Sequence, residues 1–149
     1  MHTKPLSILK EWIVEYVKNK DIFAKSIKNI KKSNDKITVE YTDKIHTFII
    51  IPFIKDINSI ILKLEQHKEF ISLVTFNSKE NLNIIIQNWN QLLKNPKFSI
   101  YFVNPFSELE KKWIIHPYTH SKISSPASLK KGLLALFSTV EEIKKEDFS

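Results

Sequence analysis

Short apolar runs of strand length alternate with stretches of helical periodicity along most of this chain of 149 residues. Apolar residues recur at helical spacing in residues 57–64 and 82–93, whereas residues 70–76 and 98–103 are nearly continuous apolar runs. The connections between these segments are only a few residues long. Because short connections between alternating strands and helices favour a mostly parallel sheet with helices on its faces, the pattern predicts an α/β fold.

The N-terminal part of the chain follows a different pattern. A helix is predicted from Pro5, with apolar residues at helical spacing as far as Ile30 and a break near residues 19–21. Residues 37–41 then alternate between apolar and polar side chains, as on a half-exposed strand. With the apolar run at residues 46–53, they predict an antiparallel hairpin.

Three further elements are predicted near the C-terminus. A short helix is expected from Ser107, where Glu110 completes a capping box, and a short strand at residues 113–116. Ser125 and Pro126 then open a C-terminal helix. We therefore expect a single three-layer α/β domain over residues 1–149. Its order is an N-terminal helix, an antiparallel β-hairpin, and then alternating helices and mostly parallel strands.

The composition excludes several classes of chemistry. The chain has no cysteine, which rules out thiol catalysis, disulfides and iron–sulfur clusters. Gly132 is the sole glycine, so a P-loop, a dinucleotide-binding fingerprint and a nucleophile elbow are all excluded. Residues 1–10 lack the long apolar stretch of a signal peptide, and no run could span a bilayer. We expect a cytoplasmic protein with no cofactor and no membrane contact.

Positive charge is concentrated at the two ends of the chain. The formal net charge is +7, and every one of the 23 basic residues is a lysine. Residues 1–36 hold nine lysines against four acids and residues 111–149 hold seven against four, whereas residues 37–110 are balanced. Such a distribution suits either a phosphate-binding face or a solvated surface. The lack of arginine excludes bidentate recognition of phosphate or guanine by guanidinium groups.

Polar residues directly follow two of the predicted strands. Asn77 and Ser78 follow residues 70–76, and Asn104 and Ser107 follow residues 98–103. In parallel sheets, the strand ends that lead into helices form one rim, where ligands usually bind. These side chains stabilise the strand exits, hold a polar or anionic group at the helix N-termini, or do both.

A third polar group follows the last predicted strand and is expected at the same rim. It contains His116, Tyr118, His120 and Lys122, in a segment predicted to be loop because Pro117 interrupts the chain. A histidine could act there as a general acid or base, with Tyr118 or Lys122 as the polarising partner. The spacing of the two histidines also occurs in zinc sites, but no acidic residue lies between them, and we expect no metal.

The predicted element order is similar to that of nuclease-like α/β folds. Such nucleases carry an acidic residue on one strand and a carboxylate-x-lysine triplet on the next, which together hold Mg²⁺. Here these triplets are Glu110-Lys111-Lys112 and Glu142-Ile143-Lys144, and both are predicted on helices. We therefore expect no nuclease activity of that kind.

The function predicted from the sequence is a non-enzymatic binding module for a polar or anionic partner, with nucleic acid the first choice. Two alternatives stay open. One is a hydrolase or transferase that uses His116 or His120, with Tyr118 as a further candidate. The other is a protein–protein adaptor with basic terminal helices. The expected binding residues are Asn77, Ser78, Asn104, Ser107, Tyr118 and Lys122.

Overall fold

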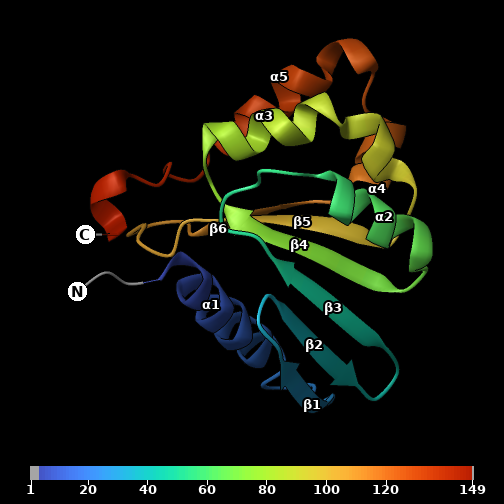
Figure 1. Cartoon of the computed structure of the whole chain (residues 1–149), viewed down its shortest axis with the longest axis vertical. Helices are drawn as coiled ribbons and strands as arrows, with labels where there is room; N and C mark the ends of the chain where they lie inside the picture. The colour runs from blue at the N-terminus through green and yellow to red at the C-terminus, as the bar shows by residue number, and fades with distance from the viewer. Residues whose placement is uncertain (1–3, 149) are drawn as a thin grey trace.

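The computed structural model describes residues 4–148, so Met1, His2, Thr3 and Ser149 of the expected domain lie outside the described residues. Within the described part, five α-helices accompany one six-stranded mixed sheet (Figure 1). The strands are β1 (Ile27–Lys32), β2 (Lys36–Tyr41), β3 (Ile45–Ile50), β4 (Phe70–Phe76), β5 (Phe98–Val103) and β6 (Lys112–Ile115). The α-helices are α1 (Pro5–Lys20), α2 (Asn58–Gln66), α3 (Lys79–Gln87), α4 (Pro117–Ile123) and α5 (Pro126–Phe137), with two 3₁₀ turns at Trp89–Leu93 and Lys145–Phe148.

The strands lie side by side in the order in which they occur in the chain. β1, β2 and β3 form an antiparallel meander, which confirms the predicted hairpin as its second half. β4 and β5 then add in parallel through α2 and α3, and β6 closes the sheet as an antiparallel edge strand. The α/β fold class predicted from the alternation of elements is confirmed.

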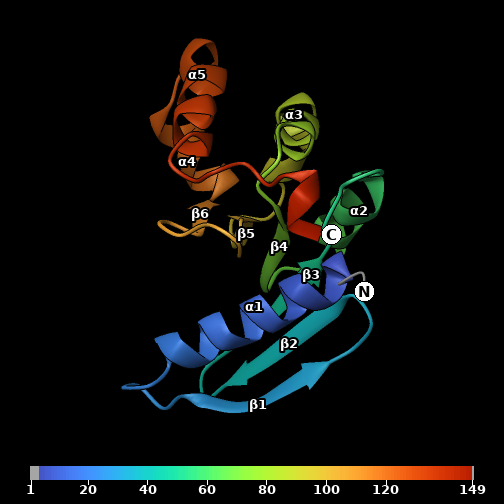
Figure 2. The same cartoon turned by 90° about the vertical axis from the view of Figure 1, so that its left-hand side faces the viewer.

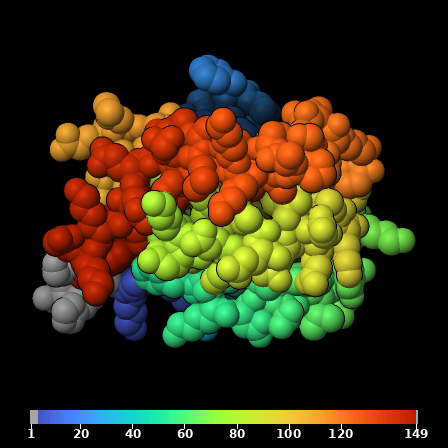
Figure 3. Space-filling model, turned by 90° about the horizontal axis from the view of Figure 1, so that it is seen from above, coloured from blue at the N-terminus to red at the C-terminus, as the bar shows by residue number. Residues whose placement is uncertain are grey.

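The two faces of the sheet are covered unequally. Helix α1 lies on one face (Figure 2). There Leu9, Ile13 and Val17 meet apolar side chains of β2 to β5, and Ile143 and Phe148 of the C-terminal segment pack against the same cluster. Helices α2, α3 and α5 cover the other face over a larger apolar core, and α3 and α5 lie next to each other (Figure 3). A single helix cannot cover one whole face of the sheet, so part of that face stays open. Within the described residues, no helix is both long and apolar enough to cross a membrane.

One predicted helical region is a strand instead. Helix α1 ends at Lys20, and Ile27 and Ile30 belong to β1. The pairing of β1 with β2 is irregular between Ile27 and Asn29, and this bulge turns Ile27 and Ile30 to the α1 side of the sheet although they are three residues apart. Because a spacing of three is also typical of a helix, the sequence pattern was misleading at this point.

Two predictions between β5 and α5 are also wrong. No helix forms at Ser107, where the Ser107 hydroxyl accepts a hydrogen bond from the Leu109 amide in a turn. Residues 117–122, predicted as loop, form α4, because Pro117 occupies the first turn of the helix and its ring is tolerated there. The prediction that both carboxylate-x-lysine triplets lie on helices is wrong as well. Glu110-Lys111-Lys112 leads into β6, whose first residue is Lys112, and Glu142-Ile143-Lys144 lies in the segment after α5.

Candidate functional site

Asn77 and Asn104, at the carboxyl ends of β4 and β5, are buried and bonded inside the protein. The Asn77 amide donates to the carbonyls of Phe137, Val140 and Glu141, and its oxygen accepts from the Trp113 indole at 2.8 Å. The Asn104 amide donates to the Glu141 carbonyl at 2.8 Å. Both side chains therefore hold the segment that follows α5 across the ends of the strands.

The two serines predicted at this rim also have partners within the protein. The Ser78 hydroxyl caps α3 by accepting from the Asn81 amide at 3.2 Å, and Ser107 closes the turn described above. Ser78 and Ser107 are both buried. Of the two interpretations of these positions, the contacts support stabilisation of the strand exits.

The third predicted group lies at the opposite end of the sheet. β6 runs antiparallel to β5, with Val103 beside Lys112 and Ile100 beside Ile115. His116 therefore follows β6 at the end where β5 begins, far from Asn77 and Asn104. The expectation that all three groups share one rim is wrong, because it treated the last strand as parallel.

The four residues of that third group point to different surroundings. The Lys122 ammonium lies 4.3 Å from the centre of the Tyr118 ring on α4. The His120 ring packs edge-on against Trp89 and lies 3.2 Å from the Ser124 hydroxyl. His116 instead lines a pocket on the open part of the α1 face.

We call this cavity of about 350 Å³ the lysine–tyrosine pocket. Its lining residues come from the C-terminal end of α1, the beginnings of β3, β4 and β5 and the end of β6. Figure 1 shows these elements. Its volume is within the range of roughly 300–1,000 Å³ found for small-ligand sites. The residues that give the pocket its character are Lys20, Lys44, Lys97, Tyr16, Tyr41 and Tyr101.

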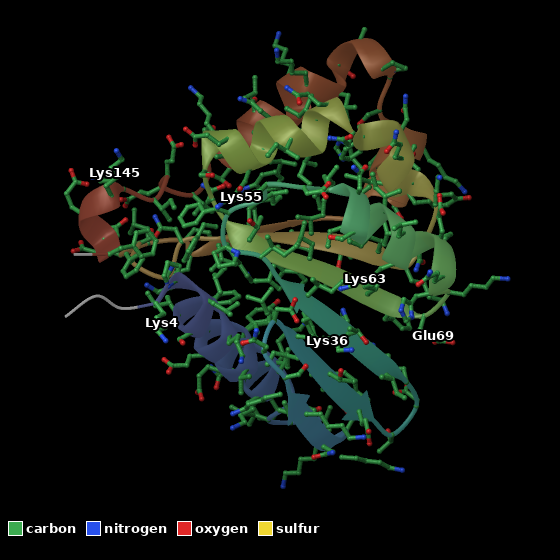
Figure 4. All side chains as sticks on the ribbon, viewed as in Figure 1. Lys4, Lys36, Lys55, Lys63, Glu69 and Lys145 are labelled. Atoms are coloured by element: carbon green, nitrogen blue, oxygen red, sulfur yellow. The ribbon has the colours of Figure 1, made fainter. Side chains whose placement is uncertain are left out.

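The three lysines of the pocket have no carboxylate partner among residues 4–148. Their ammonium groups lie over aromatic rings: Lys20 over Tyr16 at 5.5 Å, and Lys44 and Lys97 over Phe70 at 4.8 and 4.9 Å. None of the described residues that line the pocket is acidic. Glu69, which precedes β4 at this end of the sheet, projects outward (Figure 4). The three lysines therefore carry positive charge with no direct ion-pair partner among the described residues, and Asp21 and Asp43 line a separate hollow that Lys20 and Lys44 also border.

A chain of hydrogen bonds crosses three strands at the floor of the pocket. The His46 Nε2 atom lies 2.7 Å from the Ser72 hydroxyl, which lies 2.6 Å from the Ser99 hydroxyl. These side chains share a face because Phe48 pairs with Ser72 and Ser72 pairs with Ser99. The His46 ring also stacks on the Phe48 ring, with the ring centres 4.0 Å apart.

The groups at the floor are uncharged near neutral pH. Burial, with a smaller contribution from Lys44, Lys20 and His116, lowers the pKa of His46 to about 4. Burial raises the pKa of Tyr101 far above its usual value, so its hydroxyl stays protonated. The charge of the pocket at neutral pH is therefore supplied by the lysines.

Asn95 fixes the position of Lys97. Its buried amide donates to the carbonyls of His67 and Glu69 at 2.7 and 3.2 Å, and its oxygen accepts from the Lys97 backbone amide at 2.8 Å. These bonds join the segment before β5 to the segment before β4. Lys97 is thereby held next to Phe70 at the mouth of the pocket.

A second hollow of the molecule has mixed charge. A groove of about 400 Å³ beside α1 is lined by Lys10, Lys18 and Lys32, but also by Glu11 and Glu15. Among residues 4–148, no three histidine or acidic side chains gather in a way that could hold a metal ion. The lysine–tyrosine pocket is the stronger candidate because its charge has one sign.

Comparison with protein-family models, curated proteins and solved structures gives no match to this chain. Its function must be inferred from the site.

Most of the pocket residues were not predicted from the sequence. A usable signal exists in three strands, each of which carries a polar residue near its start: His46, Ser72 and Ser99. Two of them interrupt runs that are otherwise apolar and buried on both faces. Taken together with strand pairing, these three residues would have pointed to the amino ends of the strands.

Proposed function

We propose that this chain is a non-enzymatic binding module for nucleic acid and that the lysine–tyrosine pocket is its contact surface. The observation that supports this most strongly is the convergence of Lys20, Lys44 and Lys97, each without an acidic partner in the described chain, around one aromatic hollow. Lysine contacts to phosphates release counterions, and aromatic rings offer stacking surfaces for bases. We place this function in the cytoplasm, in keeping with the cysteine-free sequence.

The neighbouring cation Lys112 does not enter this proposal. It lies 5.4 Å from the centre of the Tyr16 ring, but its ammonium also lies 3.6 Å from the Glu110 carboxylate. The hydrolase or transferase alternative has less support, because its two candidate histidines do not share a site. His116 lines the pocket, whereas His120 packs against Trp89.

The test is fluorescence anisotropy with short labelled DNA and RNA between about 50 and 200 mM salt, where phosphate contacts weaken steeply. The variant Lys20→Gln/Lys44→Gln/Lys97→Gln should bind more weakly. It should also lower the steepness of the plot of log affinity against log salt by about 2, as expected for three lost phosphate contacts.

The matched control is Lys79→Gln/Lys130→Gln/Lys131→Gln, which removes the same charge from α3 and α5 on the other face of the sheet. It should change the affinity less than about twofold. The proposal fails if the two triple variants weaken binding equally, or if the unmodified protein binds no nucleic acid at low salt.

A further inference from the structure

The pocket separates charge from neutral polar groups. Lys20, Lys44 and Lys97 are exposed at its mouth, whereas Ser99 and Tyr101 deeper in the pocket are only 4% and 7% exposed. A ligand that fits this arrangement has an anionic part at the mouth and an uncharged polar part at the floor. A nucleotide has both, because its phosphate is charged and its base is neutral.

The floor offers hydrogen-bonding capacity that the protein does not use. The Tyr101 hydroxyl has no hydrogen-bond partner among residues 4–148, and His46 uses one of its two ring nitrogens. A phenol can donate or accept, and a neutral imidazole offers one donor and one acceptor. Such groups suit the edge of a base that is not already paired with another base.

The Phe70 ring at the mouth provides a stacking surface. Its contacts include two lysine ammonium groups, at 4.8 and 4.9 Å from the ring centre. These groups belong to the long side chains of Lys44 and Lys97, which can rotate away when a base stacks on the ring. The displaced ammonium groups would then be placed to contact the adjoining phosphate.

From these three features, and resting on the function proposed above, we infer that the pocket receives an unpaired base and that the partner is single-stranded nucleic acid. The bases of an intact duplex keep their pairing edges occupied and cannot enter a cavity of about 350 Å³. The chain also lacks arginine, the residue that most often recognises guanine in the major groove. Recognition by stacking tolerates different base sequences.

The experiment compares the affinity for a labelled single strand with that for a blunt duplex of the same sequence, at one salt concentration. The unmodified protein should bind the single strand at least about tenfold more tightly, because the stacking of one base contributes an affinity of about that size. Phe70→Leu should remove about tenfold of the affinity for the single strand and leave duplex binding unchanged. Tyr101→Phe should weaken single-strand binding severalfold, whereas the control Ser59→Ala, which removes a hydroxyl from the exposed side of α2 on the other face of the sheet, should not.

The outcomes separate this inference from the proposed function. Equal affinity for single strand and duplex, with no selective effect of Phe70→Leu or Tyr101→Phe, would overturn the inference while the binding function stands. If the protein binds neither the single strand nor the duplex, both the inference and the proposed function are wrong. If Phe70→Leu does not fold, the comparison of Tyr101→Phe with Ser59→Ala decides the question.

Discussion

Single buried polar residues determine much of how this molecule is held together and where its open pocket lies. His46 is half-buried and is the ionisable member of such a cluster, because it lies against the Phe48 ring and the hydroxyl of the buried Ser72. Its environment favours the neutral imidazole, which keeps charge away from the floor of the pocket.

This environment predicts a specific pH dependence of stability. The pKa of His46 is about 4 in the folded protein, against 6.5 for an unperturbed histidine, so the unfolded chain binds more protons between these values. Stability should therefore fall as the pH is lowered from about 6.5 towards 4. In urea denaturation, the unfolding free energy of the wild-type protein should fall between pH 7 and pH 4.5 by about 2 kcal/mol more than that of His46→Gln.

The control for this measurement is His67→Gln, which replaces an exposed histidine. It should leave the pH dependence of the wild-type protein in place. A His46→Gln protein that loses stability with pH as steeply as the wild type would show that His46 titrates normally in the folded state.

Asn77 makes a second prediction at the residue scale. Replacing it with alanine leaves the Trp113 indole N–H and three backbone carbonyls without their side-chain partner. Since a buried group that loses its partner costs about 1–3 kcal/mol, Asn77→Ala should lower the unfolding free energy by about 2–4 kcal/mol. Asn83→Ala on the exposed side of α3 should cost little, and equal losses in the two variants would contradict this role.

Polar residues that directly follow strands need not be available to a ligand. Asn77 and Asn104 satisfy that pattern, yet they bond to a segment about 40 to 60 residues away in the chain. A single sequence does not contain this tertiary pairing. His46, Ser72 and Ser99 were recognisable as polar interruptions, but their convergence depends on strand register.

At the scale of elements, strong hydrophobic patterns were sufficient to predict helices and strands, whereas the local capping signal at Ser107 was not. Strands β4 and β5 and helices α2 and α3 were predicted near their observed positions because burial fixes their periodicity. The capping signal at Ser107 failed because residues 104–111 turn back to begin β6, and the backbone N–H of Asn104 donates to the Lys111 carbonyl at 2.7 Å. This turn sets the direction of β6. The direction of β6 in turn determines at which end of the sheet His116 lies.

The C-terminal 3₁₀ turn acts as a structural element of its own. The ring of Phe148 packs edge-on against Phe53, Phe76 and Phe106, with ring centres 5.1 to 6.0 Å apart. Phe148→Ala should therefore lower the unfolding free energy by about 1–2 kcal/mol, since the ring is partly exposed.

Phe23→Ala is the matched control for this variant, because the Phe23 side chain is 96% exposed. Thermal unfolding should place that variant within about 0.5 kcal/mol of the wild type. If Phe148→Ala were equally neutral, the C-terminal turn would contribute nothing measurable to the fold.

At the scale of the whole molecule, the unequal covering of the sheet explains why a pocket exists. Three layers form, but one of them is the single helix α1, and the amino ends of β3, β4 and β5 extend beyond its C-terminal end. The lysines at this end of the sheet, Lys20, Lys44 and Lys97, are exposed and need no further element to cover them. The open surface is a consequence of the same topology that buries the carboxyl ends under the segment after α5.

An NMR titration of the isotope-labelled protein with a short single-stranded oligonucleotide tests most directly whether the lysine–tyrosine pocket binds nucleic acid. If the lysine–tyrosine pocket is the contact surface, the largest shifts should occur at Ser99, Tyr101 and Lys97 and at the His46 imidazole. The amides of Asn77 and Asn104 should stay nearly unchanged. Shifts concentrated at Asn77 and Asn104, with the pocket unaffected, would contradict the account.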